Sequence, residues 1–223
     1  MSSKKRIVVL SDSCALPRDE LKYEETYFYL LKENMPYYDV INTSVRGNTI
    51  VNSYINRNDF YLYYNPDVVI VHLGVVDLYP RPYPVNIFWK LFFLLLKKIG
   101  INVDEILKYF RLYYKIGDFF NFTEVSFDKY KKHYKLLIDS IPLNAKIVCI
   151  GFVNPSKILA RSKKYSNMVK EYNDFISSFA DNKRIFYLDL FALDQSYTIW
   201  DGYHFNSKIS EYIFYKINKI IKI

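Results

Sequence analysis

Residues 6–13 of the sequence read RIVVLSDS, a short apolar run that ends in three polar residues. Uninterrupted apolar runs of this length are typical of strands buried on both faces of a parallel sheet. In such sheets the loops after the carboxyl ends of the strands carry the groups that bind ligands. The stretch therefore predicts a buried parallel strand that leads into a loop and brings Ser11, Asp12 and Ser13 to the edge of the sheet where ligands bind.

The same pattern recurs along the whole chain. Further strands are predicted over residues 38–42, 68–73, 146–151 and 184–189, and helices over 19–33, 126–140, 166–179 and from about Asn206. Strands that alternate with helices form an open parallel sheet with helices on both faces. We therefore expect one α/β domain over residues 1–223, with three layers (α/β/α) and a five-stranded parallel sheet.

Residues from about 79 to 125, after the third strand, interrupt this alternation. A proline-rich segment at 80–84 is followed by the apolar run IFWKLFFLLLKK at 87–98 and by a second aromatic helix at about 106–114. The apolar run is shorter than the roughly 20 residues that cross a bilayer. We expect a helical insertion over one edge of the sheet, with 87–98 as a buried helix or lid; weak contact with a membrane surface is the alternative.

Composition excludes several classes of protein. The 223 residues are 51% hydrophobic and 24% charged, which is ordinary for a folded domain. The formal charge is +8, but the lysines are scattered, so we expect no nucleic-acid partner. The apolar run after the basic N-terminus spans only residues 7–10, which is too short for a signal peptide, and this favours a cytoplasmic protein.

Cysteines, histidines and glycines give no sign of a cofactor. Cys14 and Cys149 imply no disulfide framework, and with three histidines at these spacings they predict no metal site. There is no glycine-rich phosphate loop, so no organic cofactor is expected.

Two distant segments carry residues suited to nucleophilic catalysis. In DGYH, residues 201–204, Asp201 can accept a hydrogen bond from His204 and leave the other imidazole nitrogen free as a base. Ser13, at the end of the first strand, becomes a nucleophile when a base removes its proton. The alternatives are a turn cap for Asp201, a surface position for His204 and a helix N-cap for Ser13. Gly47 and Gly74 also end strands, where the backbone turns or approaches a ligand.

Four motifs in order resemble those of SGNH/GDSL hydrolases. Residues 10–18, LSDSCALPR, resemble the first block, whose serine follows Gly-Asp; Gly47 in VRGN resembles the second-block glycine. GVVD at 74–77 stands where the family has Gly-x-Asn-Asp, and DGYH matches its Asp-x-x-His block. Together the motifs span nearly the whole chain.

The resemblance implies a flavodoxin-like SGNH fold and a set of site residues. Ser13 would be the nucleophile, His204 the base and Asp201 its partner, with the N–H groups of Ser13 and Gly47 forming the oxyanion hole. The residues implied on the substrate side are Asn48, Gly74, Val76 and Asp77.

Two positions depart from the family pattern. Ser11 replaces the first-block glycine, and Val76 stands where the family has an asparagine that donates a third hydrogen bond. Loss of one oxyanion donor typically costs about 2.7–4 kcal/mol in the transition state. Asn48, Asn154 and Asn206 are candidates to replace it.

Residues 72–81, HLGVVDLYPR, are also similar to SGNH proteins of bacterial surface-polysaccharide clusters, which have Val-Asp followed by Pro-Arg. This resemblance implies a glycan or small-molecule substrate, and Arg81 as a ligand for its carboxylate or phosphate or as a brace for the insertion. We expect a serine esterase or acyltransferase acting on an acylated carbohydrate. The alternative is a catalytically impaired carbohydrate-binding protein. The oligomeric state stays open.

Overall fold

The computed structural model describes residues 4–83, 87–109, 112–120, 122–154, 163–199 and 201–222. Its centre is a five-stranded, fully parallel sheet in the order β2-β1-β3-β4-β5. The strands are β1 (Lys5–Ser11), β2 (Tyr38–Asn42), β3 (Val68–His72), β4 (Lys146–Ile150) and β5 (Ile185–Leu188). The predicted sheet is confirmed, and each strand lies within about one residue of its expected position.

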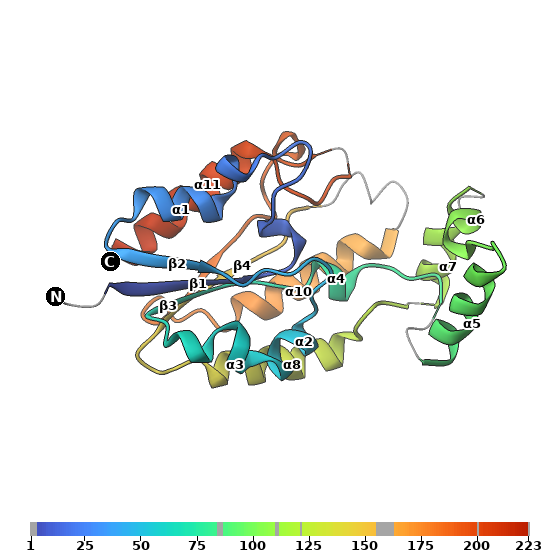
Figure 1. Ribbon diagram of the computed structural model, residues 1–223, viewed down its shortest axis with the longest axis horizontal. Coiled ribbons are helices and arrows are strands. Elements are labelled where there is room, and N and C mark those ends of the chain that lie inside the picture. The colour runs from blue at the N-terminus through green and yellow to red at the C-terminus, as the bar shows by residue number, and fades with distance from the viewer. Residues whose placement is uncertain are drawn as a thin grey trace.

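Helices cover both faces of the sheet, which confirms the three-layer architecture. One face carries α1 (Tyr27–Asn34) and α11 (Ser207–Lys222), and the other carries α2 (Ile50–Ile55), α3 (Arg57–Phe60), α8 (Phe127–Ser140) and α10 (Lys163–Ser177) (Figure 1). Residues 7–10 of β1 are fully buried, as an apolar strand between two helical layers requires. In α11, Ile209, Ile213 and Ile217 form the predicted buried face.

The segment after β1 differs from the long helix expected over residues 19–33. Two short 3₁₀ helices, Ser13–Ala15 and Tyr23–Glu25, precede α1, and Arg18 and Leu21 pair through backbone hydrogen bonds of 2.8 and 3.0 Å. The α-helix begins only after Thr26, whose hydroxyl accepts a hydrogen bond from the Tyr29 N–H. That prediction was wrong because the paired turn at Arg18 and the cap at Thr26 outweigh the helical preference of the residues between them.

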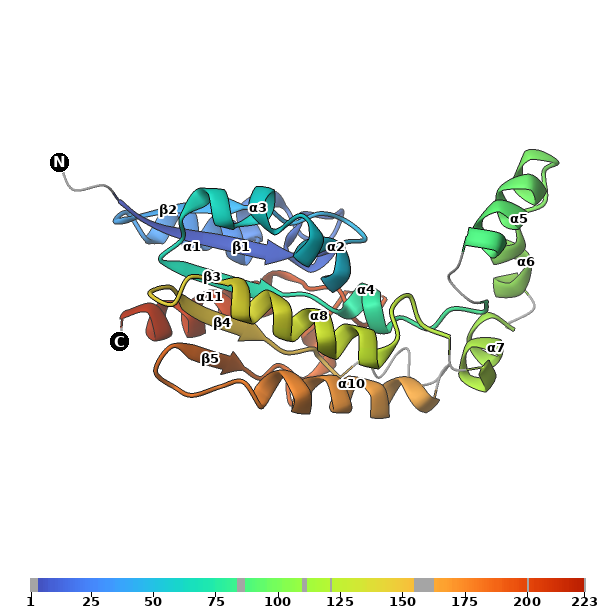
Figure 2. The ribbon, with the colours of Figure 1, turned by 90° about the horizontal axis from the view of Figure 1, so that it is seen from below.

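The insertion consists of α5 (Ile87–Lys98), α6 (Val103–Tyr109) and α7 (Tyr113–Phe120), and follows the short α4 (Val75–Leu78). These three helices stand beyond the carboxyl ends of the strands, at the end of the molecule away from the termini, and do not lie over a sheet edge as expected (Figure 2). The helix expected at 106–114 is divided between α6 and α7. The Arg81 N–H donates to the Phe122 carbonyl at 2.8 Å and closes the base of the insertion. Across the described ranges, no helix is long and apolar enough to cross a bilayer.

Candidate active site

Ser13 is held at the carboxyl end of β1, an inner strand of the sheet. The chain leaves β1 at Ser11 and turns at once into the 3₁₀ helix Ser13–Ala15. The Asp12 carboxylate caps this helix by accepting a hydrogen bond from the Cys14 N–H at 2.8 Å. The Ser13 hydroxyl oxygen lies 2.9 Å from His204 Nε2, although 191 residues separate the two in sequence.

The turn before α11 fixes the imidazole. His204 Nδ1 lies 2.5 Å from Asp201 Oδ2, and Asp201 Oδ1 accepts hydrogen bonds from the N–H groups of Tyr203 (3.1 Å) and His204 (3.0 Å). Gly202 has a φ of 83°, which lets the chain turn this tightly. The side chains of His204 and Asp201 are only 7% and 12% exposed. The structure thus brings the three predicted side chains into one hydrogen-bonded row.

Burial and charge set the protonation of this row. Burial lowers the pKa of His204 below its ordinary value; Asp201 opposes that shift, and the positive charges of Arg18 and Arg46 add to it. Burial alone would raise the pKa of Asp201, but hydrogen bonds from the His204 side chain and backbone outweigh it and lower that pKa. At neutral pH the pair is therefore a neutral imidazole beside a carboxylate, the state that a general base requires.

The loop after β2 lies next to Ser13. The Val45 N–H donates to the Ser11 carbonyl at 3.2 Å, and Gly47 follows with a φ of 73°. Among hydrogen bonds between described residues, neither the Ser13 N–H nor the Gly47 N–H is used as a donor. Both remain available for a developing oxyanion.

Asn48 and Asp77 hold this loop, and do not form a substrate surface as expected. Both side chains are buried. Asn48 donates to the Ser53 hydroxyl at 2.8 Å, and both carboxylate oxygens of Asp77 accept the Ile50 N–H, at 3.1 and 3.2 Å. Their physical role is to fix the N-terminus of α2, and with it the position of Gly47.

Gly74 is required by packing. It has a φ of 133°, and a Cβ atom there would come within 2.6 Å of the Phe152 ring and 2.9 Å of the Tyr130 hydroxyl. Val76 follows it, half-buried, in α4.

The three asparagines considered as replacement donors differ. Besides Asn48, the Asn206 amide is engaged, donating to the Ser196 carbonyl at 2.5 Å. Asn154 differs from both because its side-chain oxygen is buried and has no partner among the described residues.

Arg81 lies at the base of the insertion. Its Nε forms an ion pair with Glu124 Oε2 at 3.0 Å, and its guanidinium lies 5.7 Å from the centre of the Tyr79 ring. This geometry matches the brace that was the alternative to a substrate ligand.

Arg18 is the residue at this site that sequence reasoning missed. Its Nη2 contacts His204 Nε2 and donates to the Ser13 carbonyl at 3.3 Å. The Arg46 guanidinium donates to the Pro17 carbonyl at 2.7 Å and keeps a second positive charge nearby. The only signal in the sequence was the place of Arg18 at the end of the LSDSCALPR block, where nothing distinguishes it from a surface arginine.

His72 is a core residue, as its apolar strand indicated. Its ring stacks on Phe205 at a centroid distance of 5.1 Å, and burial lowers its pKa to about 3. Within the part of the chain that is described, no three His, Cys, Asp or Glu side chains gather in a way that could hold a metal ion.

Comparisons with solved structures agree with this fold. An acetylxylan esterase from Geobacillus stearothermophilus, solved as a catalytic mutant, has 14% identity and a TM-score of 0.62, over 99% of this chain and 95% of its own. The acetyl xylan esterase AlAXEase has 18% identity and a TM-score of 0.62, over 96% and 98%. TesA has 13% identity and a TM-score of 0.63, over 98% of both chains. No curated protein matches the sequence.

Sequence comparison gives the family. The profile of the GDSL-like lipase/acylhydrolase family matches residues 18–211, which covers most of the chain, including the DGYH turn. The match begins after Ser13, whose place beside His204 comes from the structure. This chain belongs to the GDSL-like lipase/acylhydrolase family, and it is a serine ester hydrolase.

Proposed function

We propose that Ser13, His204 and Asp201 cleave the ester through an acyl-enzyme. The observation that carries this proposal is the 2.9 Å contact between the Ser13 hydroxyl and His204 Nε2, continued to Asp201 at 2.5 Å. His204 removes the hydroxyl proton as Ser13 attacks the carbonyl carbon, and Asp201 stabilises the imidazolium that forms. His204 then returns the proton to the leaving alcohol, and water attacks the acyl-enzyme by the same route.

The oxyanion of each tetrahedral intermediate would lie between the Ser13 and Gly47 N–H groups. The hydrogen bonds that fix both loops support this assignment, because a donor aids catalysis most when it needs no reorganisation. Val45 ties the Gly47 loop to β1, and Asp77 ties it to α4. Val76 leaves the third family donor missing, so the proposed site works with two.

The substrate we propose is an acylated carbohydrate, and in particular an acetylated one. Two structural neighbours are acetylxylan esterases. The likeness of residues 72–81 to proteins of surface-polysaccharide clusters also supports a carbohydrate substrate. An acyl-enzyme can also pass its acyl group to a sugar hydroxyl, so acyl transfer uses the same three residues.

Acetate release from acetylated xylo-oligosaccharides and acetylated amino sugars tests the proposal. Wild type should release acetate, and Ser13→Ala should lower kcat by about 10⁴-fold or more. Ser178→Ala, at an exposed serine beyond α10, is the matched control and should match wild type. Equal rates for wild type and Ser13→Ala would remove Ser13 from the mechanism.

A catalytically impaired enzyme that mainly binds its carbohydrate is the second candidate, because two observations favour it. Val76 removes a donor, and the Arg18 guanidinium contacts the nitrogen of His204 that must accept the serine proton. In that case the wild-type protein would bind acetylated oligosaccharides in calorimetry but release acetate only slowly.

A further inference from the structure

One side of α5 in the insertion is apolar and exposed. The side chains of Phe88, Leu91, Leu94 and Leu95 are 83%, 55%, 56% and 61% exposed. Their spacings of three and four residues place them along one side of the helix. A contiguous apolar surface of this kind marks an interaction site on a soluble domain.

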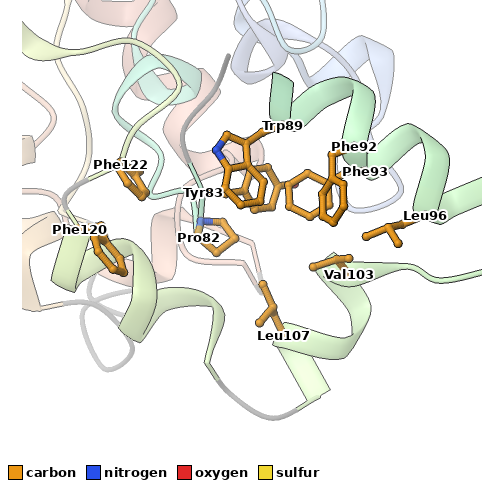
Figure 3. A pocket seen from close by; sticks show the side chains of 10 residues that line it. All are labelled: Pro82, Tyr83, Trp89, Phe92, Phe93, Leu96, Val103, Leu107, Phe120 and Phe122. Carbon is orange, nitrogen blue, oxygen red and sulfur yellow. The ribbon is translucent and has the colours of Figure 1, made fainter. Parts of the chain in front are cut away.

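The other side of α5 is apolar as well. Trp89, Phe92, Phe93 and Leu96 line a cavity of about 470 Å³, whose other walls include residues of α6 and α7 (Figure 3). The rings of Trp89 and Phe93 stack at a centroid distance of 5.5 Å. An apolar side of a helix normally lies against a protein core, a partner or lipid. In this structure α5 lies at the outer end of the molecule and is not packed inside a protein core (Figure 1).

The charges of α5 favour lipid over a protein partner. Every charged residue between Ile87 and Lys98 is a lysine, and Lys97 and Lys98 form its exposed last turn. The whole chain carries a formal charge of +8. Lysines next to exposed phenylalanine and leucine suit an anionic bilayer, where rings and aliphatic chains enter the acyl region and ammonium groups meet phosphates.

The length and position of α5 fit a helix lying at the surface of a bilayer. Its 12 residues are too few to cross one. The insertion extends beyond the carboxyl ends of the strands, away from the body (Figure 2). We propose that α5 docks this protein on anionic lipid bilayers, with Phe88, Leu91 and Leu95 in the acyl region and Lys97 and Lys98 at the phosphates. This inference is independent of the proposed reaction.

Flotation of the full chain with lipid vesicles tests the proposal. Vesicles of phosphatidylcholine alone are compared with vesicles that contain about one third phosphatidylglycerol, at low and high salt. Wild type should float with the anionic vesicles and less so at high salt. Leu91→Glu with Leu95→Glu should lower the partition coefficient at least about tenfold. Leu143→Glu, at an 86% exposed leucine in the loop after α8, is the matched control and should float like wild type.

Charge is tested separately from apolar contact. Lys97→Glu with Lys98→Glu should lower binding to anionic vesicles about tenfold or more, with little effect on neutral ones. Circular dichroism and hydrolysis of a soluble acetate ester report whether each variant is folded, so loss of vesicle binding is distinguished from unfolding and from a failed reaction.

Two results would overturn the proposal. One is wild-type protein that stays with the unbound fraction on anionic vesicles at low salt. The other is a wild-type dimer in light scattering that Leu91→Glu with Leu95→Glu converts to a monomer without any effect on vesicle binding, because the apolar face would then belong to a second copy of the chain.

Discussion

The body and the insertion are both rich in aromatic side chains but place them in opposite surroundings. In the body, Tyr130 and Tyr134 are at most 1% exposed, and their rings lie 5.5 Å apart beneath the sheet. In the insertion, Phe88 and Phe119 are 83% and 78% exposed. Burial of aromatic surface is a main source of folding free energy, so the body supplies its own stability. The insertion carries apolar surface that the described chain leaves uncovered.

The largest expected difference between the two regions is in the loss of stability when a glycine is replaced by alanine. Gly74→Ala in the body forces a Cβ against Phe152 and Tyr130 at a φ of 133°. It should lower the free energy of unfolding by about 4 kcal/mol, the sum of overpacking and backbone strain. Gly100→Ala in the insertion meets nothing within 4 Å at a φ of 83° and should cost about 1 kcal/mol. Urea unfolding measures both, and equal losses would contradict the assigned packing.

The next effect depends on pH and belongs to Asp12. Burial raises the pKa of this carboxyl group to about 6 from 3.8. The unfolded chain therefore releases the proton near pH 4, whereas the folded chain keeps it until about pH 6, and stability falls as pH rises through that window. The difference in unfolding free energy between wild type and Asp12→Asn should change by about 3 kcal/mol between pH 4 and pH 7.

A matched change in the insertion serves as the control for that measurement. Leu94→Ala changes an exposed side chain on α5 that does not titrate. Its stability difference from wild type should stay nearly constant over the same pH range. If the stability difference between wild type and Asp12→Asn does not change with pH, the pKa of the buried Asp12 carboxyl group is not raised.

Val76→Asn tests whether a change in the body, unlike one in the insertion, alters the rate of ester hydrolysis. An asparagine at position 76, in α4, supplies the third donor that the family pattern has, and a single donor is worth about 2.7–4 kcal/mol. We expect kcat/KM for a soluble acetate ester to rise about tenfold or more. Val103→Asn, in the wall of the cavity of the insertion, should leave that rate unchanged. A lower rate for Val76→Asn would mean that the site is organised around valine.

The smallest expected effect is a shift of the acid limb in the pH–rate profile. Burial lowers the pKa of His204, and the Arg18 charge lowers it further. Activity requires the neutral imidazole, so Arg18→Ala should move the acid limb of kcat/KM to higher pH. Arg81→Ala, which breaks the ion pair at the base of the insertion, should leave the limb in place. An unchanged limb in Arg18→Ala would remove the guanidinium from the electrostatics of the base.

The sheet could be predicted because its signals are local and strong, whereas the meeting of Ser13, His204 and Asp201 could be predicted only from several weak motifs that stand in the family's order. Buried parallel strands read as continuous apolar runs, and Ser13 and the DGYH turn each lie at the edge of such an element. Because both segments adjoin the carboxyl ends of parallel strands, they are expected at the same edge of the sheet.

The remaining features depend on contacts that a sequence does not display. Arg18 contacts His204 from a turn in which the backbone of Arg18 pairs with that of Leu21. Asn48 and Asp77 resembled substrate ligands, but the Ser53 hydroxyl and the Ile50 N–H engage them inside the protein. The sequence predicts an insertion over one edge of the sheet, whereas its helices lie beyond the carboxyl ends of the strands (Figure 2).

Labelling with a fluorophosphonate probe tests the central claim most directly. The reagent bonds to a serine only when a base activates its hydroxyl, so wild-type protein should be modified once, on the peptide that contains Ser13. His204→Ala should lose the modification while keeping the circular dichroism spectrum of the folded protein. Modification of another serine, or an unmodified but folded wild-type protein, would contradict the account.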